Sequence, residues 1–389
     1  MRVIGLLQPA ELVAFDQLMR LRPLEPPDDR LVIVEVTAED VQRQGVDKLE
    51  ERSLENGSLE KLLRNLNAYE PSVIALDIYQ KASVESEYQY LIDQLKNNDR
   101  FINVCTGGII DNELGVAPPK EILEKDLLTR VGFANSLTDR DDGLIRRHLL
   151  SIQLSPPSLC TVPFSLSFLV ANLYLNNLDH NLHFQEGILE SDSQQFPALT
   201  FNSGGYQNLD DRGYQILLNY RATNTLDAIT PHRLTLTEAL ENPFTEDMIR
   251  GKIILIGTTD PYFRDLHRTP FSRGFITSDR TPGIFVNAHM VSQLVSAVID
   301  KRPLIWWLPE YLELLWIFAW GGIGSAIAWY FKSPKKFGFA LVGSIALLSF
   351  TCYGVLMIGG WIPLIPPFLA LLLAGGTLFT YRPKFFRSI

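Results

Sequence analysis

The stretch GKIILIGTTDPYFRDLHRTPFS, residues 251–272, joins a short apolar run to a loop rich in polar side chains. Its apolar part, Ile253–Ile256, leads directly into glycine, two threonines and Asp260. A short, fully apolar run is typical of a strand that is buried on both faces of a parallel sheet. Because the loops after such strands commonly hold ligands or chemistry in α/β proteins, this stretch predicts both a fold class and a place for a site.

Four other short runs, rich in branched apolar and aromatic residues, also predict buried strands. Two amphipathic helices accompany them: leucines recur at helical spacing over residues 59–66, and a second apolar periodicity follows Gly283. Strands that alternate with helices predict an α/β fold, with a mainly parallel sheet flanked by helices, over residues 31–304. Besides residues 252–257, the predicted strands are Leu31–Val36, Ser72–Ile78, Phe101–Thr106 and Tyr214–Tyr220.

Residues 1–30 are predicted to form a membrane-proximal amphipathic helix and a linker. Leu12, Phe15 and Met19 share one face of this helix, and Glu11 belongs to its polar residues. The segment has neither the long apolar core nor the small-residue cleavage site of a signal peptide. We therefore infer that the natural chain begins upstream with another membrane span.

Three long segments of the C-terminal part contain almost no charged residues. Each is long enough to cross about 30 Å of hydrocarbon at about 1.5 Å per residue. We expect residues 305–389 to form a membrane region with transmembrane helices at about residues 312–331, 337–358 and 361–380. Prolines crowd the start of the third segment, so its regular helix is expected to begin near Pro366.

The distribution of charge predicts an orientation. Residues 301–389 contain eight basic and two acidic side chains, whereas residues 1–300 contain 27 and 42. The basic side chains beyond residue 311 lie in the short loop Lys332–Lys336 and after residue 380, and short basic loops stay in the cytoplasm. We therefore expect residues 1–311 to be extracytoplasmic and the C-terminus to be cytoplasmic. An outer domain this acidic is a poor partner for nucleic acid.

The three cysteines, Cys105, Cys160 and Cys352, are far apart and odd in number. This pattern excludes a dense disulfide framework and a cysteine-based zinc site, and it leaves the redox compartment open. No cofactor and no metal ion is expected. The acidic turn TDRDDGLIRR, residues 138–147, lacks the twelfth-position glutamate of an EF-hand, so its acids are expected to face Arg146 or Arg147 instead.

Several motifs occur along the chain in a fixed order. Besides residues 251–272 they are VIVEVTAEDV (32–41), PSVIALDIYQ (71–80), VGFANSLTDRDDGLIRR (131–147), ILLNYR (216–221), TPGIFVNAHMVSQLV (281–295) and KRP with WW (301–307). Together with the three trailing apolar segments, they resemble the second type of CHASE domain (CHASE2), an extracytoplasmic sensory domain associated with bacterial cyclases and histidine kinases. The resemblance covers essentially the whole chain.

The resemblance implies a sensor in the bacterial inner membrane. Its outer domain would detect an undefined small molecule or envelope ligand and drive a cytoplasmic cyclase, histidine kinase or Ser/Thr kinase. The chain departs from the pattern because a leading span and an output domain are missing, as in a split gene or a sensor with a separate partner. Homodimerisation would fit the mechanism. The rival interpretations are a membrane-anchored outer hydrolase and a scaffold that has lost its output domain.

Six polar residues are candidates for ligand binding. One follows the strand at residues 72–78 and three follow the strand at residues 252–257, so they are expected to meet at the carboxyl edge of the sheet. An arginine after a third strand would offer a charged fork for a carboxylate or phosphate. A histidine on the last helix of the domain is expected to face either the sheet or this edge. The residue at the end of the strand at residues 72–78 is Asp77, and the three after the strand at residues 252–257 are Asp260, Asp265 and His267. The arginine is Arg221 and the histidine is His289.

A catalytic centre is the competing interpretation of the same loop. Asp265 and His267 could act as an acid–base pair, with Thr258 or Thr259 as the nucleophile. The chain, however, contains no GxSxG, HExxH or GxxxxGK[ST] motif. The residues therefore favour a structural joint that contributes to a ligand pocket over a catalytic centre.

Overall fold

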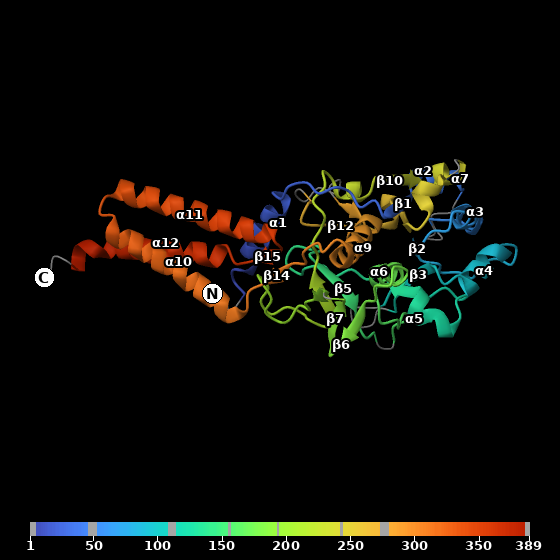
Figure 1. The fold of residues 1–389 in the computed structure, drawn as a ribbon, viewed down its shortest axis with the longest axis horizontal. Helices are drawn as coiled ribbons and strands as arrows, with labels where there is room; N and C mark the ends of the chain where they lie inside the picture. The colour runs from blue at the N-terminus through green and yellow to red at the C-terminus, as the bar shows by residue number, and fades with distance from the viewer. Residues whose placement is uncertain are drawn as a thin grey trace. The chain divides into compact units, whose positions relative to one another are not determined.

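The structure is a computed structural model that describes residues 5–45, 53–107, 114–154, 157–192, 194–241, 244–272 and 280–385. The chain, coloured from one end to the other in Figure 1, forms two compact units. The larger unit comprises residues 23–198 and 212–302, and the smaller unit comprises residues 1–22, 199–211 and 303–389. The N-terminal segment therefore groups with the C-terminal helices, although the two lie at opposite ends of the sequence.

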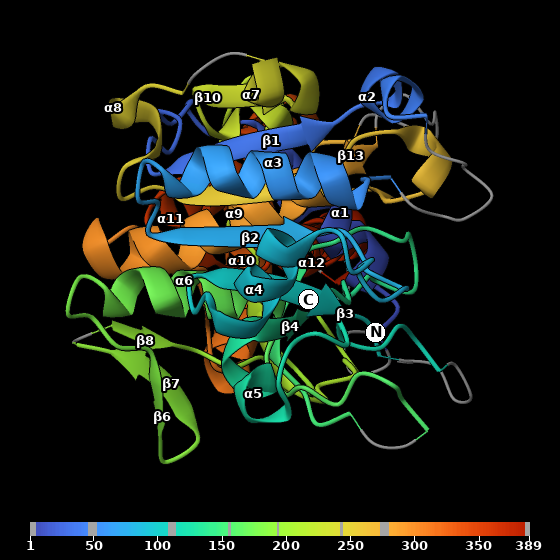
Figure 2. The same cartoon turned by 90° about the vertical axis from the view of Figure 1, so that its right-hand side faces the viewer.

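Six parallel strands form the main sheet of the larger unit (Figure 2). They are β1 (Leu31–Val36), β2 (Val73–Asp77), β3 (Phe101–Cys105), β4 (Val131–Phe133), β10 (His232–Thr235) and β11 (Ile253–Thr258). Their spatial order is β10–β1–β11–β2–β3–β4, and every neighbouring pair is parallel. The predicted α/β fold with a mainly parallel sheet is confirmed. β11 lies in the middle of it, with Gly257 paired with Asp77 of β2.

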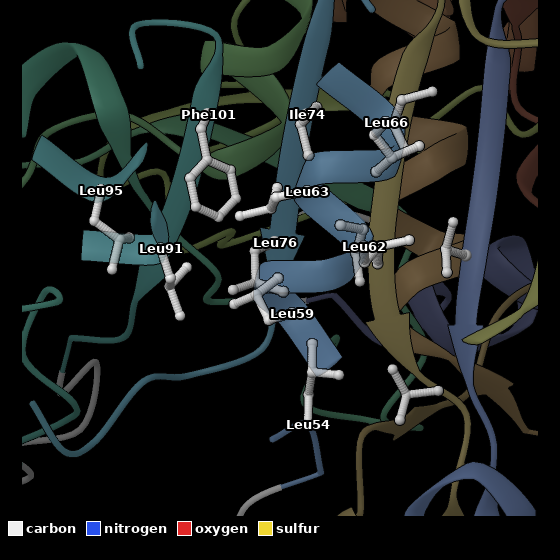
Figure 3. Packing of buried hydrophobic residues seen from close by; sticks show 14 of the residues in the cluster. Leu54, Leu59, Leu62, Leu63, Leu66, Ile74, Leu76, Leu91, Leu95 and Phe101 are labelled. Carbon is white, nitrogen blue, oxygen red and sulfur yellow. The ribbon is translucent and has the colours of Figure 1, made fainter. Parts of the chain in front are cut away.

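Alternate residues of the central strands pack against helices on the two faces of the sheet. On one face, residues of β1, β2 and β11 share a core with the leucines of α3 (Asn56–Asn67), beside which α4 (Gln89–Asn97) packs. Figure 3 shows Leu59, Leu62, Leu63 and Leu66 of α3 around Ile74 and Leu76 of β2.

The opposite face of the sheet is covered by α9 (Gly283–Ile299) and α6 (Leu166–Asn176), which pack against each other. Gly257 of β11 lies directly under α9, because a Cβ at this position would come within 2.7 Å of the Ile284 side chain. β11 is therefore followed by a helix on one face, whereas its neighbour β2 is followed by α4 on the other. Such a reversal leaves a crevice outside the carboxyl ends of the two strands.

The prediction for Tyr214–Tyr220 was partly wrong. Only Tyr214–Leu217 form a strand, β9, and it pairs antiparallel with β5 (Arg147–Ser151) outside the parallel sheet. An apolar run shows that a strand is buried but does not identify its partner. The loop after β9 consequently does not belong to the carboxyl edge of the parallel strands.

The remaining elements are short. They are α2 (Ala38–Arg43), η2 (Glu124–Asp126), α5 (Leu127–Arg130), β6 (His183–Gln185), β7 (Ile188–Ser191), β8 (Gln194–Phe196), η3 (Leu226–Ile229), α7 (Leu236–Glu241), α8 (Glu246–Ile249), η4 (Pro261–Phe263), β12 (Leu266–His267), β13 (Thr281–Pro282), β14 (Trp306–Trp307) and β15 (Gly360–Trp361). β6, β7 and β8 form a small antiparallel sheet, and β12 pairs with β13 across the ends of the loop that follows β11.

A disulfide joins Cys105, the last residue of β3, to Cys160. The sequence reasoning left the redox compartment open, and it could not pair these cysteines because 55 residues separate them. Disulfides persist in oxidising compartments, so this bond agrees with an extracytoplasmic location of the larger unit. Cys352, in the smaller unit, is free and buried.

The disulfide predicts the number of thiols that can be labelled. Protein that is denatured without a reductant should react with iodoacetamide at one cysteine, Cys352, and reduced protein at three, Cys105 and Cys160 included. Mass spectrometry of the labelled peptides measures this directly. Three reactive thiols before reduction, in protein isolated from the cell envelope, would contradict the bond.

The C-terminal part of the smaller unit consists of α10 (Glu310–Tyr330), α11 (Pro334–Met357) and α12 (Ile365–Phe385). Among the described residues, α10 and α11 are long and apolar enough to cross a membrane. The apolar part of α12, Ile365–Tyr381, is shorter, so the predicted number of three membrane helices is not confirmed. α12 begins one residue before Pro366, where its start was predicted.

The N-terminal helix α1 (Gln8–Arg20) buries Leu12, Phe15 and Met19, as predicted. Its polar residue Glu11, however, is only 3% exposed. The Glu11 carboxylate accepts hydrogen bonds from the backbone N–H groups of Leu364, at 3.0 Å, and Ile365, at 2.8 Å. Glu11 therefore caps the N-terminus of α12, a contact that no local sequence pattern indicates.

Candidate ligand-binding site

A cavity of about 750 Å³ opens at the carboxyl ends of β2 and β11. Residues that follow β2, β4 and β11 form its walls together with the first turns of α9. This is the position that the reversal of helix placement predicts, and the volume is within the range of small-molecule sites. The polar lining residues are Ser53, Asp77, Tyr79, Lys81, Ser136, Thr258, Tyr262, Arg264, Asp265, His267 and Asn287.

Asp77 is the last residue of β2 and is partly buried in this cavity. Its Oδ2 accepts a hydrogen bond from Nδ2 of Asn287, on α9, at 2.8 Å. Burial and the negative charge of nearby Asp265 raise the pKa of Asp77 to about 7, against the weaker opposing effects of Asn287 and His267. The carboxyl group is therefore poised to gain or lose a proton near neutral pH.

Asp265 and His267 form a pair in the same cavity, with Nε2 of His267 at 2.9 Å from Oδ1 of Asp265. The Asp265 carboxylate lies against Gly283, the first residue of α9, and a Cβ at this glycine would overlap both of its oxygens. The positive end of the helix favours a negative charge at this position. Asp265 is thus held at the N-terminus of α9, with Asp77 nearby.

Asp260 has a structural role beside the cavity. It is 5% exposed, and its Oδ1 accepts a hydrogen bond from the backbone N–H of Tyr262 at 2.9 Å, which caps η4. Thr258, the nucleophile considered for a catalytic centre, donates its hydroxyl to the carbonyl of Val36 at 3.2 Å. The Thr258 hydroxyl therefore donates to the backbone and not to His267 or Asp265.

Arg221 lies away from the cavity, so the expectation that it converges with the aspartates was wrong. It follows β9, which does not belong to the parallel sheet. Its guanidinium is buried and donates to Oγ of Ser296, at 2.8 Å, and to the carbonyl of Pro26, at 3.0 Å, with Oδ2 of Asp28 at 3.5 Å. Arg221 holds the segment before β1 against α9.

His289 is 1% exposed and faces the interior beside Arg221. Its Nδ1 accepts the backbone N–H of Arg221 at 3.2 Å, and its Nε2 lies 2.9 Å from the carbonyl of Leu226. Burial lowers the pKa of His289 to about 3, so the ring is a neutral donor and acceptor within the fold. Of the six candidates, the structure brings Asp77, Asp265 and His267 together in the cavity and places Asp260, Arg221 and His289 outside it.

A family model described as the CHASE2 domain matches residues 1–326 of the chain. The chain belongs to the CHASE2 family. CHASE2 domains are extracytoplasmic sensory domains of membrane proteins that bind extracellular signals and couple to cytoplasmic output modules. The suspected family is confirmed. Neither a search of curated proteins nor a search of solved structures gives a match.

The cavity of this CHASE2 domain contains residues that sequence reasoning missed. Asn287 lies one turn into α9, and Tyr79 and Ser136 lie in loops after β2 and β4. Burial, and then the charges of Asp77 and Asp265, raise the pKa of Tyr79, so its phenol stays neutral. Asn287 lies four residues after Gly283, on the same face of α9. This helical spacing is the sequence signal that could have identified Asn287 as a lining residue.

The acidic turn of the CHASE2 domain has the structural role that was predicted. Arg146 pairs with Asp139 and with Asp142, both at 2.6 Å, and Nε of Arg147 pairs with Asp139 at 2.9 Å. Asp139 and Asp142 are therefore each neutralised by an arginine of the same turn. Within the ranges that the structure covers, no group of three or more His, Cys, Asp or Glu side chains is arranged to hold a metal ion.

Proposed function

We propose that this CHASE2 protein is an integral membrane sensor whose extracytoplasmic domain binds a small ligand in the cavity beside Asp77, Asp265 and His267. The observation that carries the proposal is the convergence of these side chains in a cavity of about 750 Å³ at the switch between β2 and β11. Such crevices are the common ligand sites of parallel α/β sheets. The family supports a sensory role for this domain.

The proposed membrane topology has three spans, α10, α11 and α12. α12 comprises 21 residues and would cross about 30 Å at about 1.5 Å per residue. The short basic loop Lys332–Lys336 and the C-terminal arginines and lysine would lie in the cytoplasm of a bacterial cell. Residues 1–311 would then be outside the inner membrane, where the Cys105–Cys160 disulfide is stable.

Transmission would begin at α9. Gly283 and Asn287, in its first two turns, line the cavity, and the helix ends at Ile299, eleven positions before α10 begins at Glu310. A ligand that favours one position of α9 would bias the segment that leads into the membrane, because only differential affinity shifts an equilibrium. The recipient would be a cytoplasmic cyclase or kinase module, and a homodimer would allow two such modules to meet.

A thermal-shift screen of the full chain in detergent tests the proposal, with small metabolites, ions and cell-wall fragments as ligands. A ligand present at about a hundred times its Kd should stabilise the protein by about 2.7 kcal/mol. Ser136→Trp would fill the cavity without removing a charge, and it should abolish the shift. Arg221→Lys, outside the cavity, should preserve it. Hits that survive Ser136→Trp, or a broad screen without hits, would count against this cavity as the sensory site.

A further inference from the structure

The charge of the cavity restricts the class of ligand that it can hold. Two carboxylates, Asp77 and Asp265, line it at half-buried positions, while the basic side chains Lys81 and Arg264 lie at exposed positions of its lining. Among the described residues, Asp77 accepts a hydrogen bond from the uncharged amide of Asn287, and Asp265 has the imidazole of His267 as its neighbour. The half-buried part of the lining therefore carries acceptors and negative charge, and the positive charges lie at its exposed part.

The usual place for an anion in such a crevice is already occupied. In parallel α/β sheets, anionic ligands bind at the N-terminus of the helix that follows the strand. Here the Asp265 carboxylate lies at the N-terminus of α9, against Gly283, where there is no room even for a Cβ. The protein thus supplies its own anion, the Asp265 carboxylate, at this position. An anionic ligand would be repelled by both Asp265 and Asp77.

We propose that the cavity recognises a small molecule through a primary ammonium group, which binds between the carboxylates of Asp77 and Asp265. An ammonium group has three donors and a compact charge, and each carboxylate oxygen has two lone pairs, so the acceptors suffice even with Asn287 and His267 in place. This inference rests on the proposed ligand-binding function of the same cavity and specifies its ligand.

Binding of the ammonium group is coupled to the loss of a proton from Asp77. In the empty cavity, the pKa of Asp77 is raised to about 7 by burial and by Asp265. A cation beside Asp77 stabilises the ionised carboxylate and lowers its pKa. Binding therefore releases the proton that Asp77 carries at lower pH. The other titratable or charged groups that line the cavity around it are Tyr79, Lys81, Tyr262, Arg264, Asp265 and His267. Ligand affinity therefore falls as the pH drops below about 7.

Isothermal titration of the full chain in nanodiscs tests the ligand class with four probes. Putrescine, 1,4-butanediol and succinate share a four-carbon backbone but end in ammonium, hydroxyl and carboxylate groups. L-Lysine tests whether the site also accepts an amine that carries a carboxylate, because this carboxylate would reach Lys81 or Arg264. Putrescine or L-lysine should bind at least tenfold more tightly than butanediol and succinate. Binding of succinate or butanediol alone, or of none of the four, would overturn the inference.

The pH dependence and two variants identify the coupled group. For a pKa of about 7, affinity should fall about tenfold from pH 8 to pH 6, with release of nearly one proton at pH 6 and almost none at pH 8. Asp77→Asn, which keeps the shape and the contact with Asn287, should abolish proton release and weaken binding at least tenfold. His267→Gln should retain proton release, and Asp93→Asn, an exposed acid on α4, controls for net charge. Proton release that persists in Asp77→Asn would refute the role of this carboxylate.

The outcome also separates this inference from the proposed function. Screening hits that Ser136→Trp abolishes, but that are anions or neutral molecules, would refute the ammonium site and leave the cavity as the sensory site. Hits that Ser136→Trp leaves intact would refute both. The comparison of the four probes on the unmodified chain requires no variant to fold.

Discussion

Replacing Asp28 with alanine is expected to lower the free energy of unfolding of the larger unit by about 3–5 kcal/mol. Asp28 is 3% exposed and lies just before β1. Its carboxylate accepts Nε and Nη2 of Arg30, at 2.7 and 2.9 Å, and the hydroxyl of Ser292, at 2.6 Å. Nη2 of Arg221 lies 3.5 Å away. Alanine would remove the carboxylate that acts most strongly on the buried Arg221 guanidinium, which is the costly way to break a buried ion pair.

Asp29, the next residue, provides a matched control. Its side chain is 69% exposed and pairs with Lys252, at 2.7 Å, and His232, at 2.8 Å. Because exposed ion pairs contribute little, Asp29→Ala should cost less than about 1 kcal/mol. All six tryptophans lie at or beyond residue 306, so the larger unit is best followed by hydrogen exchange of the β1 and β11 amides during urea unfolding. Equal losses for the two variants would show that the Asp28 network contributes no more stability than an exposed ion pair.

The Asp28 contribution should also depend on pH. Burial opposes ionisation of Asp28, but Arg30, Ser292 and Arg221 outweigh it and hold the pKa of this carboxyl below its usual value. A carboxyl whose pKa is lower in the folded state stabilises the protein above its unfolded pKa of about 3.9. That stability is lost as the pH falls through the folded pKa. The difference between the unmodified chain and Asp28→Asn should therefore shrink below about pH 4.

Replacing Glu11 with alanine is expected to speed amide exchange at Leu364 and Ile365 about a hundredfold. Pro363, Pro366 and Pro367 have no N–H group, so in this stretch Leu364 and Ile365 are the two backbone donors that need an acceptor, and Glu11 serves both. Each buried donor left unsatisfied costs about 1–3 kcal/mol. A combined loss of about 2.7 kcal/mol corresponds to a hundredfold change in the opening equilibrium.

Two further variants sharpen this measurement. Glu11→Gln keeps one acceptor oxygen and removes the charge, so its effect should be intermediate. Gln17→Ala changes an exposed residue of the same helix and should leave the exchange unchanged. Phe15 packs 4.3 Å from the ring of Trp361, so tryptophan fluorescence should report loosening of α1 in the same samples. Unchanged exchange in Glu11→Ala would show that water or lipid satisfies these donors as well as the carboxylate does.

Local patterns predicted the centre of the fold. β1, β2, β3 and β11 and the helices α3 and α9 lie within a few residues of their predicted bounds, because burial imposes a period on the residues of each element. Three of the six candidate site residues meet in one cavity for a similarly general reason. Parallel strands end at a common edge, so Asp77 and the loop after β11 had to be neighbours once the two strands were.

The remainder depends on contacts between residues far apart in sequence. β9 has the composition of a buried strand, yet its partner is β5, and this pairing removed Arg221 from the site. Glu11 looked like a solvated residue of an amphipathic helix, but its partners lie more than 350 residues away. Cys105 and Cys160 are likewise joined across a long loop. Such pairings are decided by the packed structure and leave no periodic signal in the chain.

The composition of the smaller unit also has a consequence for biosynthesis. α1 finds its partners Trp361 and α12 only after roughly 340 further residues have been made, which takes about 17–70 s at typical rates of translation. Throughout that time the apolar face formed by Leu12, Phe15 and Met19 lacks its final neighbours, and the larger unit can fold first. The slow step in the assembly of this protein should therefore be the packing of Trp361 and α12 against α1. Until then, chaperones or the neighbouring membrane surface would have to cover the apolar face of α1.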